Sequence, residues 1–222
     1  MTYTIAYGQR ERVLKLPNFD KPLFHYGFYL GLNANSYKVS YKPSFISQPE
    51  VQVQSSMGFN VGLIADFKLH NNFNIRFEPG LMSNTKVLIF KHLPENDANQ
   101  RTREIGATFL HLPLVLKVST NRLNNIRPYV LGGMSYDYNF SSNERDSEDN
   151  FSGKFRTTST NFMYELGIGI DLYLNYFKLS PSIRGMFAIN NEIKYDNINP
   201  SPWTDPVNFL GTRGVFLHVS FE

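Results

Sequence analysis

The 222-residue sequence contains no cysteine, so disulfide scaffolds and zinc sites built on thiolates are excluded. It also has no run that approaches the ~20 consecutive apolar residues of a transmembrane helix. Lysine and arginine form no block, and the net charge of +3 is too small to predict a nucleic-acid partner. These absences exclude three broad classes: disulfide-rich scaffolds, helical membrane proteins and nucleic-acid-binding proteins.

Motifs that carry chemistry are missing as well. We find no G-x-S-x-G, no H-E-x-x-H, no phosphate-binding glycine loop and no Cys/His cluster. No window shows apolar residues at i, i+3 and i+4 over three turns, so amphipathic helices are not expected either. We therefore predict a protein that is not an enzyme and that binds no cofactor and no metal.

What the chain does contain is period-2 alternation of apolar and polar residues, with an aromatic content of 15%. Residues 162–174 show it most clearly, because one parity is wholly apolar while the other carries Glu165, Asp171 and two glycines. This run would be roughly 40 Å long, about twice a typical soluble strand. Tilted by ~40°, it still crosses a ~25 Å apolar band, so it predicts a transmembrane strand with its apolar face toward lipid.

Residues 177–189 repeat the pattern after a tight turn at Asn175 and Tyr176. Six more alternating segments bring the number of expected strands to eight. They are 24–33, 57–69, a strand that begins at 73 with 86–91 as a candidate continuation, 104–118, 127–140 and 215–221. The connections alternate between long (34–55, 92–102, 141–156 and 190–213) and short. This alternation predicts an all-β, eight-stranded antiparallel up-and-down transmembrane β-barrel of outer-membrane type.

This prediction divides the chain into a periplasmic N-terminal lead-in (1–23), with a possible signal remnant at 1–9, and a β-barrel domain (24–222). The expected location is the bacterial outer membrane, with both termini periplasmic. The competing fold is a soluble lipocalin-like barrel, which would bury the apolar residues inside and expose the charged ones.

The alternate residues that are expected to face the lumen, the inward parity, carry charges of both signs. The acidic members are Asp66, Glu78, Asp137, Glu165 and Asp171, and the basic members are Lys68, Arg76, Lys117, Lys178 and Arg184. An eight-stranded barrel is just wide enough for side chains to fill, so we expect these charges to pair and close the lumen. In particular, Glu165 or Asp171 should pair with Arg184, Lys178 or Arg76. The alternative is a charged path for a small solute.

Two histidines and one tryptophan are the remaining candidates for a site. His25 and His218 lie on strands that become neighbours on closure, and both are expected to point inward. They could form a two-His metal site or a hydrolase dyad, or simply be hydrogen-bonded lumen residues. Trp203 in the last loop is either an exposed anchor for a partner or a residue that folds its own loop against the rim.

Several runs are similar to the PorT family of outer-membrane barrels. The most particular are Arg10-Glu11-Arg12 and Leu16-Pro17-Asn18-Phe19-Asp20, and the others lie at 25–28, 30–33, 109–114 and 127–133. The resemblance implies a non-enzymatic accessory component of the type IX secretion and gliding motility machinery of Bacteroidetes. Implied partners are other protein components of that machine besides outer-membrane lipid, and no catalytic residues carry over. The second hypothesis is a free-standing small barrel with a ligand-binding, adhesion or hydrolase role.

Overall fold

The computed structural model describes residues 13–42, 51–91, 101–142, 144, 155–195, 201 and 203–222. Residues 1–12, which include the expected signal remnant at 1–9, lie outside the described residues. The described residues form ten strands. They are β1 (Phe24–Tyr41), β2 (Val51–Ser55), β3 (Met57–His70), β4 (Phe73–Phe77), β5 (Gly80–Phe90), β6 (Thr102–Ser119), β7 (Ile126–Asn139), β8 (Thr160–Tyr173), β9 (Lys178–Ala188) and β10 (Val207–Phe221).

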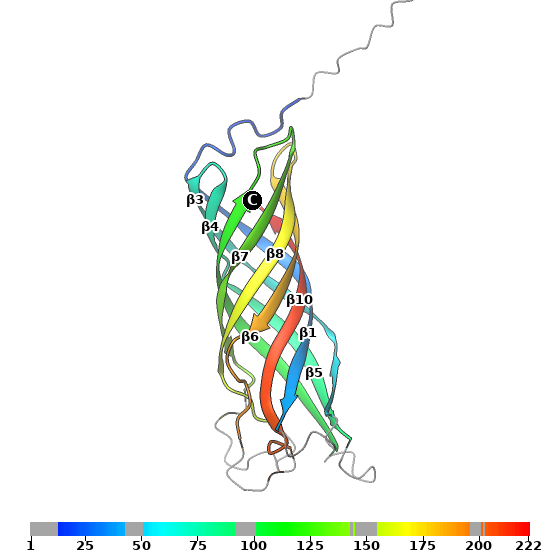
Figure 1. Cartoon of the computed structure of the whole chain (residues 1–222). Helices are drawn as coiled ribbons and strands as arrows, with labels where there is room; N and C mark the ends of the chain where they lie inside the picture. The colour runs from blue at the N-terminus through cyan, green and yellow to red at the C-terminus, as the bar shows by residue number, and fades with distance from the viewer. Residues whose placement is uncertain are drawn as a thin grey trace, which may run out of the picture.

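The ten strands make eight continuous segments of one wall. Only Ser56 separates β2 from β3, and only Glu78 and Pro79 separate β4 from β5, where the proline has no amide hydrogen for the ladder. Every neighbouring pair is antiparallel, and β1 pairs with both β10 and β3, which closes the ring. The predicted eight-stranded up-and-down barrel is confirmed (Figure 1).

The wall has two distinct ends. At one end, the short-turn end, lie three tight connections (71–72, 120–125 and 174–177), the start of β1 and the C-terminus, which Figure 1 places at the top. At the other, the loop end, lie the long connections. Among the described residues, no helix is long and apolar enough to cross a membrane.

Side-chain exposure shows which parity faces outward. On β8, Leu166 and Ile168 are 60% and 64% exposed, whereas Glu165 and Asp171 are 1% exposed. The apolar face therefore lies outside and the charged face inside, as a barrel in lipid requires. This arrangement excludes the lipocalin-like alternative, which has the opposite polarity.

At the loop end, the strands extend further than the sequence predicts. The expected loop 34–55 contains the second half of β1 and all of β2, and β10 begins at Val207 inside the expected loop 190–213. Backbone pairing continues there because Tyr37 still faces Thr212 in register. The outward residues Ser36, Lys38 and Ser40 are polar, so the apolar alternation ends while the strand does not.

Two buried apolar clusters lie on the inner side of the wall. One fills a layer of the lumen with Met82, Ala107, Phe109, Met163, Met186 and Phe216. The other, the apolar loop-end cluster, contains Tyr37, Leu88, Phe90, Ile105, Phe155, Ile193, Trp203, Val207 and Leu210. Most of the charged residues predicted to face inward lie between the first cluster and the short-turn end, whereas Lys86 and Glu192 are buried at the loop end.

Candidate functional site in the lumen and at the short-turn end

Arg76 on β4 is the centre of the charged interior. Its Nε lies 3.3 Å from Asp66 Oδ2 and 3.3 Å from Glu78 Oε1, and its Nη2 lies 2.9 Å from Glu222 Oε1. Asp66 is its register partner on β3, and Glu78 follows two residues later on the same inward parity. The guanidinium is fully buried, so three carboxylates compensate one cation in a region without solvent.

Arg184 on β9 joins this group from across the lumen. It forms an ion pair with Glu78, in which Nη2 lies 3.1 Å from Oε1, and its Nη1 lies 4.0 Å from Glu165 Oε2. Glu78 therefore bridges two arginines from opposite sides of the wall. The Arg76–Glu78–Arg184 group spans the interior and leaves its members no more than 1% exposed.

Three further contacts extend the network. Lys117 Nζ donates to both oxygens of Asp171 at 2.8 Å. Lys178 Nζ lies 2.9 Å from Glu222 Oε2. His111 lies between two carboxylates, with Nδ1 2.7 Å from Asp137 Oδ1 and Nε2 3.1 Å from Glu165 Oε1.

The structure thus buries nine of the ten predicted charged residues in this interior, and places the tenth, Lys68, at its mouth beside Lys117 and Lys178. Lys68 is half-buried and donates to the backbone carbonyl of Asp20 at 2.7 Å. The expected Glu165–Arg184 pair is present, although Glu165 lies closer to His111. Asp171 pairs with Lys117, which the sequence-based pairing did not include.

Sequence reasoning missed His111 and Glu222 as members of the network, although both share the inward parity. His111 was left out because a neutral histidine does not enter a count of charges. Glu222 shares its parity with His218, but its role depends on the height at which β10 ends beside Lys178.

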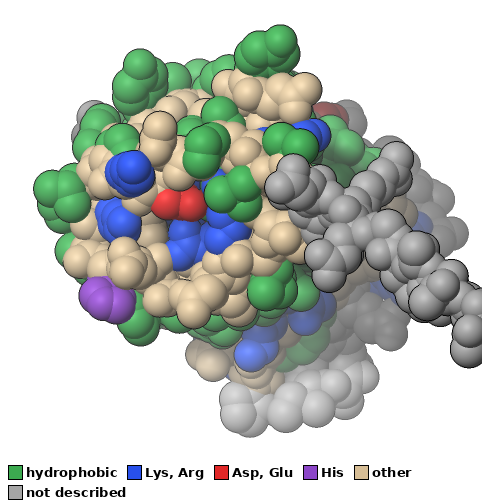
Figure 2. All heavy atoms as spheres, turned by 90° about the horizontal axis from the view of Figure 1, so that it is seen from above, with side chains coloured by type: hydrophobic (Ala, Val, Ile, Leu, Met, Phe, Trp, Pro, Cys, Tyr) green, Lys and Arg blue, Asp and Glu red, His purple; other side chains and the backbone are tan. Residues whose placement is uncertain are grey.

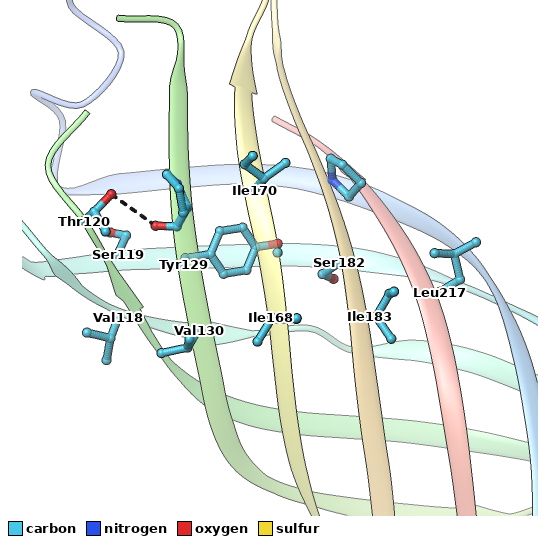
Figure 3. A pocket seen from close by; sticks show the side chains of 13 residues that line it. Val118, Ser119, Thr120, Tyr129, Val130, Ile168, Ile170, Ser182, Ile183 and Leu217 are labelled. Atoms are coloured by element: carbon cyan, nitrogen blue, oxygen red, sulfur yellow. Dashed lines mark hydrogen bonds between the residues drawn. The ribbon is translucent and has the colours of Figure 1, made fainter. Parts of the chain in front are cut away.

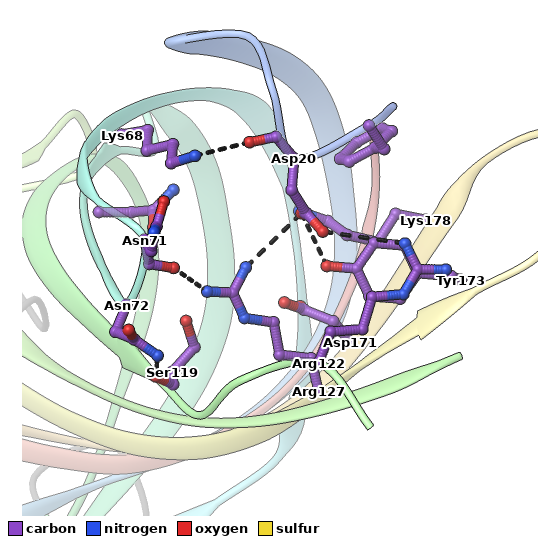
Figure 4. Close-up of polar contacts among 12 residues, drawn as sticks. Asp20, Lys68, Asn71, Asn72, Ser119, Arg122, Arg127, Asp171, Tyr173 and Lys178 are labelled. Atoms are coloured by element: carbon purple, nitrogen blue, oxygen red, sulfur yellow. Dashed lines mark hydrogen bonds and ion pairs between the residues drawn. The ribbon is translucent and has the colours of Figure 1, made fainter. Parts of the chain in front are cut away.

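The short-turn end is closed by residues 15–20, which we call the N-terminal cap. The Asp20 carboxylate lies 3.5 Å from Arg127 Nη1 and 3.8 Å from Arg122 Nη1, and it accepts a hydrogen bond from Tyr173 Oη at 2.8 Å (Figure 4). Phe19 of the cap lies under Lys178, whose Nζ is 4.9 Å from the ring centroid. The cap therefore contacts the lumen network directly.

Arg122, in the 120–125 turn, fixes the start of the cap. It donates to the carbonyls of Lys15 and Leu16, the latter at 3.1 Å, and its guanidinium stacks 3.6 Å from the Tyr173 ring centroid. Leu16 has a φ of 49°, a left-handed conformation that costs a non-glycine residue about 1 kcal/mol or more. These contacts hold that conformation in place.

Basic side chains surround the cap. Figure 2 looks onto this end and shows lysine and arginine side chains around a small acidic area at the mouth. A small polar cavity beneath the cap is lined by Lys68, Lys117, Arg127 and Lys178 together with Asp20 and Asp171. The mouth is thus filled by paired charges rather than open.

Residues 9–194 match the family model of the outer membrane protein beta-barrel domain. The chain belongs to this family. No curated protein matches the sequence.

Solved outer-membrane barrels are similar at low identity. Neisserial surface protein A is 11% identical, with coverage of 87% of this chain and 95% of that chain and a TM-score of 0.41. OprG from Pseudomonas aeruginosa is 12% identical, with coverage of 90% and 94% and a TM-score of 0.44. Ail of Yersinia pestis, in complex with the heparin analogue sucrose octasulfate, is 13% identical, with coverage of 88% and 96% and a TM-score of 0.39.

In this outer-membrane barrel the two candidate histidines are far apart. In the register of β1 and β10, His218 lies opposite Gly31. Gly31 is six residues from His25 along β1, which separates the two histidines by roughly 20 Å. His25 Nε2 contacts the Phe19 carbonyl at 2.6 Å, whereas the His218 ring stacks on Tyr29 with centroids 4.3 Å apart. The hypothesis of a two-His metal site or hydrolase dyad is wrong, because the stagger of the strands separates the two residues.

Trp203 is not the exposed anchor that one interpretation expected. Its side chain is 3% exposed within the apolar loop-end cluster, and the Arg103 guanidinium lies 4.9 Å from the ring centroid. The indole folds its own loop against the rim. Among the described residues, no group of three or more His, Cys, Asp or Glu is placed to hold a metal ion.

A polar chain lies beside this cluster at the loop end. Lys86 Nζ donates to Thr212 Oγ1 at 3.0 Å, and Thr212 donates to Glu192 through its backbone amide at 2.7 Å and its hydroxyl at 2.8 Å. Burial raises the pKa of the Glu192 carboxyl above its usual value. Hydrogen-bonded polar groups and an apolar cluster therefore fill the loop end of the barrel.

Proposed function

We propose that this outer-membrane barrel is a non-enzymatic accessory component of a type IX protein-secretion machine. The observation that carries the proposal is the N-terminal cap. Leu16 to Asp20, one of the two runs most particular to the PorT resemblance, is ordered against the short-turn end. Arg122, Arg127 and Tyr173 hold it there.

The filled lumen supports an accessory rather than a conducting role. Arg76, Glu78 and Arg184 span the interior, and the apolar loop-end cluster lies beyond them. A barrel of this width, filled in this way, has no room for a secreted protein. The barrel therefore acts on secretion through protein partners that include a larger pore.

The proposed orientation places both termini, and hence the cap, in the periplasm. Short turns on the periplasmic side and long loops outside are the usual arrangement in outer-membrane barrels. The basic mouth around Asp20 would then face the periplasmic components of the machine. Lys21, which is exposed beside the cap, lies on the surface that such a partner would contact.

Deletion of the gene tests this role. We expect cargo proteins to remain in the periplasm and gliding to stop, because the machine would lack a required component, and re-expression of the wild-type chain should restore both. Cargo in the culture medium is measured by quantitative mass spectrometry. Normal secretion in the deletion strain would overturn the proposal and favour the free-standing barrel.

Photo-cross-linking locates the partner surface. A cross-linking residue at Lys21 should capture a protein component of the machine, whereas one at Asn208, exposed at the loop end, is the matched control. Capture at Asn208 and none at Lys21 would contradict the assignment of the short-turn end to the partner.

A further inference from the structure

The outer wall is hollowed by a groove near the short-turn end. The groove has a volume of about 760 Å³ and crosses β6 to β10 (Figure 3). Its walls are outward apolar side chains, namely Val130, Ile168, Ile170, Ile183 and Leu217. Its volume lies in the range of about 300–1,000 Å³ that is typical of ligand sites.

Pro181 and Gly169 explain why the wall is hollow here. The pairing of β8 with β9 reaches Gly169–Ser182 and resumes only at Leu172–Leu179, because Pro181 has no amide hydrogen to donate between them. Gly169 leaves space for the ring of Tyr129, since a Cβ at this glycine would lie 2.4 Å from Tyr129 Cζ. The ring passes from β7 beneath β8, toward Ser182 (Figure 3).

Tyr129 forms the floor that separates the groove from the lumen. The side chain points inward and is buried, yet it lines the outer groove. On its inner face, Lys117 Nζ lies 4.0 Å from the ring centroid, and Lys117 pairs with Asp171. A single aromatic ring therefore separates the groove from Lys117 of the charged network.

We propose that this groove binds one acyl chain of an outer-membrane phospholipid. The groove is continuous with the lipid-facing surface, so membrane lipid is the molecule next to it. No charged side chain lines it, which favours a hydrocarbon tail over a headgroup. A polypeptide segment would bring backbone amides that need partners in the apolar layer, and an acyl chain brings none.

Native mass spectrometry of the purified full chain in detergent, titrated with palmitoyl-oleoyl phosphatidylethanolamine, tests the site. We expect one lipid to be retained per protein. Ile183→Trp and Val130→Trp fill the groove from two sides, and each should weaken retention at least about tenfold, or ~1.4 kcal/mol. Leu81→Trp is the matched control, because Leu81 is an outward residue of β5, on another part of the wall, and is 47% exposed.

Heat-modifiable mobility on gels selects the variants that are folded. Equal retention in the wild type and in every folded groove variant would overturn the proposal, as would equal losses in Leu81→Trp. In membranes, a photo-cross-linking residue at Leu217 should form a lipid adduct. A protein adduct there instead would assign the groove to a protein partner and overturn the lipid site. The proposal does not depend on the secretion role.

Discussion

Replacing Arg76 by alanine is expected to lower the free energy of unfolding by about 3–5 kcal/mol, the usual cost of removing one partner from a buried ion pair. The change would leave Asp66, Glu78 and Glu222 together in a region that excludes solvent, without the cation they share. Urea unfolding of the protein refolded into lipid vesicles, followed by circular dichroism, measures the loss.

Arg213→Ala is the matched control for that experiment. Arg213 lies on β10 but is exposed on the outward side, so its loss should change the free energy of unfolding by no more than about 0.5 kcal/mol. If Arg76→Ala cost no more than Arg213→Ala, the three carboxylates would not depend on Arg76, and the proposed charge compensation would be wrong.

Arg184→Ala is expected to cost a similar amount, about 3–5 kcal/mol, for a related reason. Without Arg184, Glu78 keeps only Arg76 and Glu165 keeps only His111. The same unfolding experiment applies, and the loss should be confined to stability because the Arg184 side chain is buried in the lumen.

A double-mutant cycle separates the ion pair from other effects of the truncation. In a Glu78→Gln background the buried negative charge is already gone, so Arg184→Ala should cost about 0.5–3 kcal/mol less than in the wild type. Strictly additive losses would mean that Arg184 does not stabilise the barrel through Glu78.

The strands of the wall could be predicted from the sequence because they depend on the alternation of neighbouring residues. Each outward residue faces lipid and each inward residue faces the lumen, so a period of two identifies a strand and its orientation from the residues alone. The same rule failed past Asn35 on β1. There the outward residues leave the apolar layer and turn polar, while backbone pairing continues.

The partners inside the lumen could not be predicted in the same way. Parity says that Lys117 and Asp171 both face inward, but not that they meet across β7, since that depends on the stagger of the closed ring. The same stagger separates His25 from His218. The N-terminal cap has no periodicity at all, and only the position of Arg122 and Arg127 in the folded barrel explains why Asp20 lies there.

Single-channel recording in planar lipid bilayers tests the filled lumen most directly. Because paired charges span the interior and the N-terminal cap closes one end, the purified wild-type protein should insert without steady channel openings at either polarity. A large, steady conductance would contradict a lumen filled by the Arg76–Glu78–Arg184 group, and with it the proposal that this barrel works through partners rather than as a conduit.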